Sequence, residues 1–249
     1  MLRALRSLLL LLVLLGIAPA ARAAEQVDLL LVFAVDVSRS IDQAKFQLQR
    51  EGYAAALSDK RVLEIIAEGR HKRIAVAFVE WSGAVSQKLL IDWTVIDGAA
   101  SARKIGDQLV ELPRSFAERT SISAGIDFAM GVLANAPYQA PRRTIDVSGD
   151  GTNNSGRDVT LARDEAVAQG VTINGLVILS DRPMAWNPEH TNPPGGLENY
   201  YKTYVIGGPG SFVVVAQDFE SFGQAIVKKL IAEIAELDSP PSAQTQPDG

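Results

Sequence analysis

Apolar runs alternate with stretches of helical periodicity along this chain. The run at 29–35 is apolar at almost every position, which is typical of a strand buried on both faces of a sheet. The short connection at 81–84 predicts a hairpin, so the strand at 87–91 should be an antiparallel edge strand. Shorter apolar runs predict the remaining strands at 74–79, 144–147, 171–179 and 212–215.

Helical patterns lie between these strands. Ser40 and Gln43 form a capping-box pattern, which predicts a helix that Ser40 opens. A second helix should begin directly after Thr120, and two more are predicted at 159–169, before Gly170, and after a cap at Asp218. The apolar faces of the first, second and last of these helices comprise Phe46, Leu48 and Tyr53; Ile122, Ile126, Ala129, Met130 and Leu133; and Phe222, Ile226, Leu230, Ile234 and Leu237.

Strands that alternate with helices indicate an α/β fold. We expect a Rossmann-like, doubly wound and mostly parallel six-stranded sheet, with one antiparallel edge strand and helices on both faces. Residues 24–238 should form this single domain. The Pro-, Ser- and Gln-rich residues 239–249 should form a disordered tail.

The first 23 residues have the pattern of a secretory signal peptide. Arg3 and Arg6 precede an apolar run at 8–17, and an Ala-x-Ala cleavage site ends at Ala23. This run is shorter than the roughly 20 apolar residues of a membrane span, and no later stretch approaches that length. We therefore expect cleavage after Ala23, a periplasmic or secreted protein, and no membrane span in the mature chain.

The net charge limits the possible partners, and the absence of cysteine limits how the fold can be stabilised. Removal of the leader takes three of the 24 basic residues and none of the 29 acidic ones, which leaves a net charge of −8. Such a balance argues against nucleic acid or an anionic membrane as a partner. The chain has no cysteine, so its core has to stabilise it without disulfides.

Small oxygen-bearing side chains follow strand ends or precede a helix. Asp36, Ser38 and Ser40 follow the run at 29–35, Thr120 precedes a predicted helix, and Asp150 follows another strand. Since α/β sheets bind ligands beyond the carboxyl ends of their strands, these five side chains could converge. Mg²⁺ prefers oxygen ligands and uses only one or two carboxylates, so we expect a site for Mg²⁺ (or Mn²⁺).

The Asp-x-Ser-x-Ser motif, followed by Thr120 and Asp150, resembles the metal-ion-dependent adhesion site (MIDAS) of von Willebrand factor type A (vWFA) domains. The matching elements run from about Asp28 to Leu237. The stretch from Tyr200 to Ile226 also resembles an uncharacterised family of exported bacterial proteins that carry this domain.

This resemblance implies that Ser38 and Ser40 bind the metal directly and Thr120 directly or through water. Asp36 and Asp150 would act largely through waters. One position would then stay open for an Asp or Glu carboxylate of a protein partner. The resemblance thus implies a binding domain rather than an enzyme.

Two alternatives remain open. Asp36 and the GDGTNN segment at 149–154 also resemble haloacid-dehalogenase phosphotransferases, with Asp36 as the nucleophile. Against this, Ser38 and Asn154 replace two of that family's Asp residues, and no Lys lies between Lys104 and Asp150. In the second alternative, a bound metal only stabilises the fold. As a purely structural interpretation, Ser40 is an N-cap, Asp36 and Asp150 are turn residues at strand ends, and Thr120 is a residue at the start of a helix.

Other features have simpler interpretations. His71 and His190 lie in polar stretches and should be exposed, and no GxSxG motif supports a serine hydrolase. The long segment 181–196 is expected to be a surface excursion. Glu80, at the end of an apolar strand, is either an ordinary solvated strand end or a residue that supports the site or a partner.

Overall fold

The computed structural model describes residues 24–179 and 187–235. The predicted leader, the predicted tail, Leu237 and the part of the long segment up to Trp186 lie outside these residues. No helix in the described ranges is long and apolar enough to cross a membrane.

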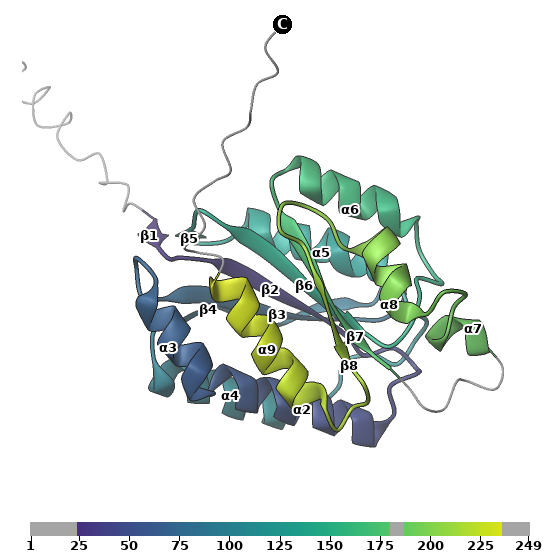
Figure 1. Cartoon of the computed structure of the whole chain (residues 1–249), viewed down its shortest axis with the longest axis horizontal. Helices are drawn as coiled ribbons and strands as arrows, with labels where there is room; N and C mark the ends of the chain where they lie inside the picture. The colour runs from purple at the N-terminus through teal and green to yellow at the C-terminus, as the bar shows by residue number, and fades with distance from the viewer. Residues whose placement is uncertain (1–23, 180–186, 236–249) are drawn as a thin grey trace, which may run out of the picture.

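A six-stranded sheet forms the centre of the molecule (Figure 1). Its strands in spatial order are β4 (Gln87–Ile96), β3 (Ile74–Trp81), β2 (Leu30–Asp36), β6 (Arg143–Gly149), β7 (Thr172–Ile178) and β8 (Val213–Ala216). β4 pairs with β3 antiparallel, whereas the other pairs in this sheet are parallel. The predicted antiparallel edge strand is therefore confirmed, although it extends to Ile96 rather than ending at Ile91.

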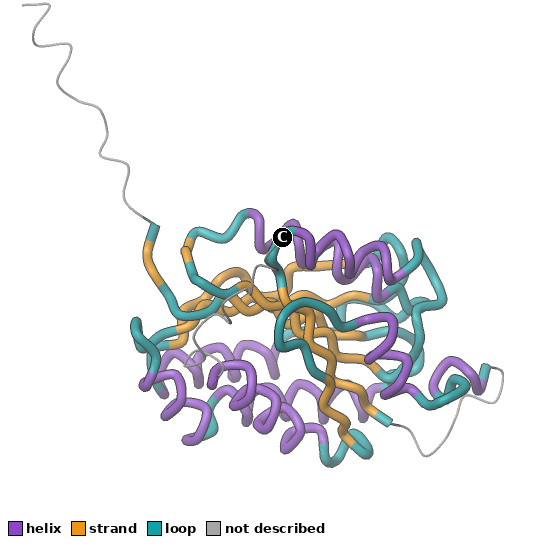
Figure 2. Tube along the Cα trace, turned by 45° about the horizontal axis from the view of Figure 1, so that its top comes forward, coloured by secondary structure: helices purple, strands orange, loops and turns teal. Residues whose placement is uncertain are grey.

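Helices cover both faces of the sheet, and Figure 2 shows the strands between the two helical layers. One layer contains α2 (Gln43–Leu57), α3 (Lys60–Glu68), α4 (Ala99–Glu111) and α9 (Phe222–Ala235). The other contains α5 (Ile122–Ala134), α6 (Val159–Ala168), α8 (Leu197–Tyr200) and the π-helical turn η1 (Tyr201–Val205). The predicted α/β architecture is confirmed, but the sequence pattern did not single out α3 and α4.

β2 is buried along its whole length, as predicted for a central strand. Successive side chains of a strand point to opposite faces of a sheet. Leu31, Phe33 and Val35 accordingly belong to the core beneath α2 and α9, whereas Leu30 and Val32 belong to the core beneath α5 and α6. The central strand is thus held from both sides by separate apolar cores.

Polar side chains cap α2, α3, α5 and α6, but the cap of α2 differs from the prediction. α2 begins at Gln43, and Asp42 caps it by accepting the backbone N–H of Lys45 at 2.9 Å. The expected Ser40 cap is wrong because Asp42 stands immediately before the first helical residue. Thr120 lies one residue before Ser121, the N-cap of α5, so its predicted place just before a helix is confirmed.

A short strand pair and a short helix mark opposite ends of the molecule (Figure 1). β1 (Glu25–Gln26) and β5 (Tyr138–Gln139) form a two-stranded parallel pair near the amino ends of β2 and β6. The short helix α7 (Pro188–Thr191) lies at the other end, beyond the carboxyl ends of the parallel strands.

Candidate metal site

The carboxyl ends of β2 and β6 lie side by side, because the two strands pair in parallel with Val35 opposite Ser148. The chain continues from β2 towards β3 on one side and later returns to β6 on the other. Such a switch in strand order is where α/β sheets bind ligands. Asp36 ends β2 and Asp150 follows β6, and both side chains are fully buried there.

Hydrogen bonds join the three hydroxyl residues to Asp150. Ser40 Oγ donates to Asp150 Oδ1 at 2.5 Å, and the hydroxyl oxygens of Ser38 and Ser40 lie 3.2 Å apart. Thr120 Oγ1 donates to Ser38 Oγ at 3.0 Å. The structure therefore brings four of the five predicted site residues into one continuous cluster.

Asp36, the fifth predicted residue, belongs to the same place through its surroundings. Its Oδ1 accepts the backbone N–H of Ser38 at 2.7 Å. Its Oδ2 faces Gly149, where an added Cβ would lie 3.0 Å from this oxygen. Neither Asp36 Oδ2 nor Asp150 Oδ2 has a hydrogen-bond partner among the described residues. The site thus keeps two buried carboxylate oxygens available to a ligand.

The negative charges of the Asp36 and Asp150 carboxylates repel each other. Burial and, next in size, the charge of Asp150 raise the pKa of Asp36 to about 8. Burial also raises the pKa of Asp150, against the opposing hydrogen bond from Ser40. A cation between the two carboxylates would stabilise their charged forms and so lower both pKa values.

Two basic residues bind the backbone carbonyls of the Asp-x-Ser-x-Ser segment at 36–40. Arg114 donates from Nε to Val37 O at 3.1 Å and from Nη2 to Ser38 O at 2.6 Å. Lys45 Nζ donates to Ser40 O at 3.2 Å and lies 3.9 Å from Asp150 Oδ2. No lysine lies between Lys104 and Asp150 in the sequence, but Lys45 reaches the site from α2.

His190 is the site residue that sequence analysis placed wrongly. The expectation of an exposed histidine is wrong, since only 4% of His190 is accessible. Its Nε2 lies 3.1 Å from Thr120 Oγ1, and its Nδ1 lies 3.2 Å from Asn154 Nδ2. Burial, followed by the nearby Arg119 charge, lowers its pKa. No local pattern marks this residue, because it meets Thr120 across 70 positions of the chain.

Glu80 is buried rather than a solvated strand end, and it supports the neighbouring loop. It forms an ion pair with Arg50 of α2, and both side chains are almost fully buried. Its Oε2 also accepts the backbone N–H of Ser115 at 2.9 Å. Since Arg114 precedes Ser115, this bond helps to position the guanidinium that holds Val37 and Ser38.

A small pocket of about 270 Å³ opens onto the hydroxyl cluster. Ser40, Thr120, Asn154 and His190 line it, together with two exposed arginines, Arg39 and Arg119. The remaining lining residues are Glu118 and Asn187. The pocket gives an outside group access to Ser40 and Thr120.

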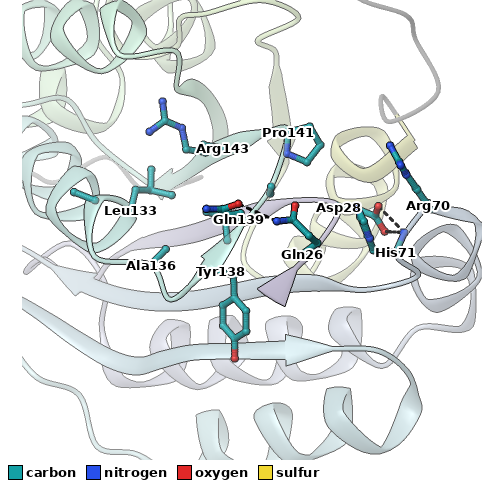
Figure 3. Close-up of a pocket in the computed structure, with 14 residues that line it drawn as sticks. Gln26, Asp28, Arg70, His71, Leu133, Ala136, Tyr138, Gln139, Pro141 and Arg143 are labelled. Carbon is teal, nitrogen blue, oxygen red and sulfur yellow. Dashed lines mark hydrogen bonds between the residues drawn. The ribbon is translucent and has the colours of Figure 1, made fainter. Parts of the chain in front are cut away.

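A larger cavity of about 770 Å³ lies at the opposite end of the sheet (Figure 3). Its polar groups bond to one another: Asp28 accepts the backbone N–H of His71 at 2.9 Å, and Gln26 donates to Gln139 at 2.9 Å. These contacts fix the β1–β5 pair and the start of β2. They engage Asp28, Gln26 and Gln139 in structural bonds, so the hydroxyl cluster remains the candidate site.

Comparisons with known proteins agree with this architecture. Proximal thread matrix protein 1 (PTMP1) from the mussel byssus, solved with a zinc-occupied MIDAS motif, is 17% identical with a TM-score of 0.55. The match covers 85% of this chain and 48% of PTMP1, so the chain spans about half of that protein.

Two bacterial surface proteins share the fold at similar levels. The pilus adhesin SpaC from Lactobacillus rhamnosus GG is 12% identical, with a TM-score of 0.56 over 84% of this chain and 31% of SpaC. The PilB minor pilin from Streptococcus sanguinis is 14% identical, with a TM-score of 0.56 over 87% of this chain and 64% of PilB. The curated proteins include no match to the sequence.

The predicted resemblance to vWFA domains is confirmed as a resemblance in fold. A family model described as "Protein of unknown function (DUF1194)" matches residues 26–238. The chain therefore belongs to the DUF1194 family, with a vWFA-like fold.

Proposed function

We propose that this protein is a metal-dependent protein-binding domain of the adhesion or scaffold type. Asp36, Ser38, Ser40, Thr120 and Asp150 would hold one Mg²⁺ (or Mn²⁺). The observation that supports this most is the pair of buried carboxylate oxygens without hydrogen-bond partners, beside three linked hydroxyls. A buried carboxylate oxygen without a hydrogen bond is costly, and a cation is the ligand that would compensate both of them.

The donor set fits a hard divalent cation. Neighbouring ligands of an octahedral Mg²⁺ lie roughly 3 Å apart, given bond lengths of about 2.0 to 2.1 Å. The Ser38 hydroxyl oxygen lies 3.0 Å from the Thr120 hydroxyl oxygen and 3.2 Å from the Ser40 hydroxyl oxygen. Among the described residues, no three or more His, Cys, Asp or Glu side chains form a group that could hold a metal. A metal at this site would therefore take hydroxyl oxygens as ligands beside the two carboxylates.

The residues around the opening of the pocket indicate which chemical group a partner would present to the metal. A bound cation supplies an electrophilic position that an outside oxygen ligand can occupy. Arg39 and Arg119 flank the opening, and exposed guanidinium groups attract carboxylates. We infer that the ligand is an Asp or Glu side chain of a protein partner. The names of the similar structures, a pilus adhesin and a matrix protein, agree with such a role.

We also infer export, with cleavage after Ala23, from the pattern of residues 1–23. Cell fractionation should recover the protein from the periplasm or the medium. Its amino-terminal sequence should begin at Ala24. Retention in the cytoplasm would contradict this inference.

Calorimetry with Mg²⁺ and Mn²⁺ tests the metal site. The protein should bind one ion, and Asp150→Ala should abolish binding because it removes a buried carboxylate of the cluster. Asp164→Ala is the control, since Asp164 is exposed and pairs with Arg163 on α6. Circular dichroism would establish that both variants fold. Equal metal uptake by wild type and Asp150→Ala would contradict the site.

A capture experiment tests the role of the metal in partner binding. Immobilised protein should retain partners from an envelope extract with Mg²⁺ present and lose them with EDTA. Ser38→Ala should behave like EDTA treatment. Retention undiminished in EDTA would mean that the metal is structural and that the partner binds another face.

Phosphatase activity is tested separately, because Lys45 lies near Asp150. Ser38 stands where the phosphatases carry a second Asp, so we expect no hydrolysis of p-nitrophenyl phosphate with Mg²⁺. Turnover that disappears in Asp36→Asn would favour the phosphatase alternative instead.

A further inference from the structure

His190 is fixed against the turn that carries Asp150. Its backbone oxygen accepts the N–H of Thr152 at 2.9 Å. Its ring covers Gly151 so closely that a Cβ there would lie 2.2 Å from Cε1. Backbone and ring together place the imidazole at the edge of the hydroxyl cluster.

Asn154 determines which ring nitrogen of His190 carries the proton. The backbone N–H of Thr120 can only donate, and it donates to Asn154 Oδ1 at 3.0 Å. The amide oxygen of Asn154 is thereby assigned, and the Nδ2 group, which also only donates, faces His190 Nδ1 at 3.2 Å. His190 Nδ1 accordingly accepts, the Thr152 hydroxyl 3.3 Å from it donates, and the proton of the neutral ring lies on Nε2.

The donor and the acceptor of each hydrogen bond in the hydroxyl cluster are then determined. His190 Nε2–H donates to Thr120 Oγ1 at 3.1 Å, and Thr120 donates to Ser38 at 3.0 Å. Ser40 gives its single proton to Asp150, so in the pair with Ser38 it has to accept. Each hydroxyl in this chain accepts one bond and donates one, which leaves one lone pair of each oxygen free.

We propose that His190 is a positioning residue of the metal site, which orients the Thr120 hydroxyl and contributes no ligand itself. This inference rests on the proposed function. It has a consequence for metal preference: with its proton on Nε2, the imidazole offers the cation no nitrogen. The site then presents oxygen ligands only, which suit Mg²⁺ and Mn²⁺, whereas Zn²⁺ favours imidazole nitrogen.

Replacing the donor tests the positioning role. His190→Leu removes the bond to Thr120 and should weaken Mg²⁺ binding by about 10- to 100-fold, the usual effect of losing a residue that orients a ligand. His190→Gln keeps an N–H donor near the Nε2 position and should restore most of the affinity. His71→Gln is the control, because His71 lies at the opposite end of the sheet. Calorimetry gives the affinities, and denaturation without metal reports folding.

Reversing the proton position tests the metal preference. In Asn154→Asp a carboxylate faces Nδ1, which would then carry the proton and leave Nε2 with a lone pair. The ratio of Zn²⁺ to Mg²⁺ affinity should rise in this variant. Adding His190→Gln to it should cancel the rise, which separates the imidazole from the added charge. Long-range ¹H–¹⁵N spectra of the wild type should show the proton on Nε2.

The outcomes separate the two proposals. Absence of metal binding in the wild type would contradict the proposed function. Metal binding that is unchanged in His190→Leu would contradict the positioning role alone. A proton on Nδ1 in the wild type, or Zn²⁺ binding that depends on His190, would overturn the inference and make His190 a ligand.

Discussion

Asp36 and Asp150 each keep one buried oxygen without a hydrogen bond in the described structure. Groups of this kind destabilise a fold when nothing compensates them. The surrounding residues nevertheless hold both carboxylates closely: Ser38 donates to Asp36, and Ser40 donates to Asp150. Such an arrangement is typical of a site prepared for a ligand rather than of an optimised core.

Gly151 offers a test of how closely the site is packed. Gly151→Ala would place a methyl group 2.3 Å from His190 Nε2, so the ring would have to leave Thr120. We expect the free energy of unfolding to fall by about 1 to 3 kcal/mol, as for other overpacked positions. Metal affinity should fall as well. Urea denaturation with a chelator measures the first effect, and calorimetry measures the second.

Gly131→Ala is the matched control for this prediction. Gly131 lies in α5, and no described atom comes within 4 Å of its added Cβ. Alanine restricts the unfolded chain and favours helix, so this variant should gain about 0.4 to 1 kcal/mol. Equal destabilisation by the two substitutions would contradict the close contact at Gly151.

Loops at the carboxyl ends of the strands bring the site together, and buried ion pairs fix them to the helices. Arg50 on α2 pairs with Glu80 at the end of β3, and Glu80 in turn holds Ser115 in the loop before α5. Arg114 of that loop bonds to the carbonyls after β2. Glu80 therefore links α2 and the end of β3 to the loop that precedes α5.

Removing one partner of this ion pair should be costly. Arg50→Met leaves Glu80 buried without its cation, so the free energy of unfolding should fall by about 3 to 5 kcal/mol. Adding Glu80→Gln should recover most of this loss, because glutamine is neutral and can still accept the Ser115 N–H. Urea denaturation of the two single variants and the double variant gives the coupling energy.

The exposed pair between Lys60 and Glu64 provides the control. Lys60→Met should change the free energy of unfolding by less than about 1 kcal/mol, since exposed ion pairs contribute little. Strictly additive losses from Arg50→Met and Glu80→Gln would show that the buried pair is not coupled.

A further buried group of charges joins elements across the molecule, separate from both the metal site and the Arg50–Glu80 pair. Lys229 of α9 lies 2.9 Å from Asp146 of β6 and also pairs with Glu233. Asn174 of β7 donates to Glu233 at 2.8 Å, so the group joins the last helix to two central strands. Two carboxyl groups share one ammonium here, and burial raises the pKa of Asp146 to about 7 despite the opposing charge of Lys229.

This pKa predicts a dependence of stability on pH. Folded Asp146 binds its proton up to about pH 7, whereas the unfolded residue releases it near its ordinary pKa of 3.8. The folded state therefore binds more protons in this interval, and the contribution of Asp146 to the free energy of unfolding should fall as the pH rises through it. Asp146→Asn should remove that contribution.

Urea denaturation at several values from about pH 4 to pH 7.5, with a chelator present, measures this effect. The informative quantity is the difference between wild type and Asp146→Asn, because other buried carboxyl groups titrate in both proteins. Parallel curves for the two proteins would contradict the raised pKa.

Local sequence patterns were sufficient for the six-stranded sheet and for four of the longer helices, α2, α5, α6 and α9. The uninterrupted apolar run of β2, the antiparallel edge strand β4 and the helix after Thr120 could all be predicted. Burial on one or both faces imposes a period on neighbouring residues, and a period can be recognised within ten to twenty positions. The order of Asp36, Ser38, Ser40, Thr120 and Asp150 could likewise be recognised as a motif.

Contacts between distant segments could not be predicted in this way. Ser40 meets Asp150 across 110 positions, His190 reaches Thr120 from α7, and Lys45 approaches from α2. Competition between neighbours also mattered, since Asp42 caps α2 and leaves Ser40 free to bond to Asp150. Hydrogen-bond partners and burial at the strand ends depend on how loops pack against one another, and that packing leaves no period in the sequence.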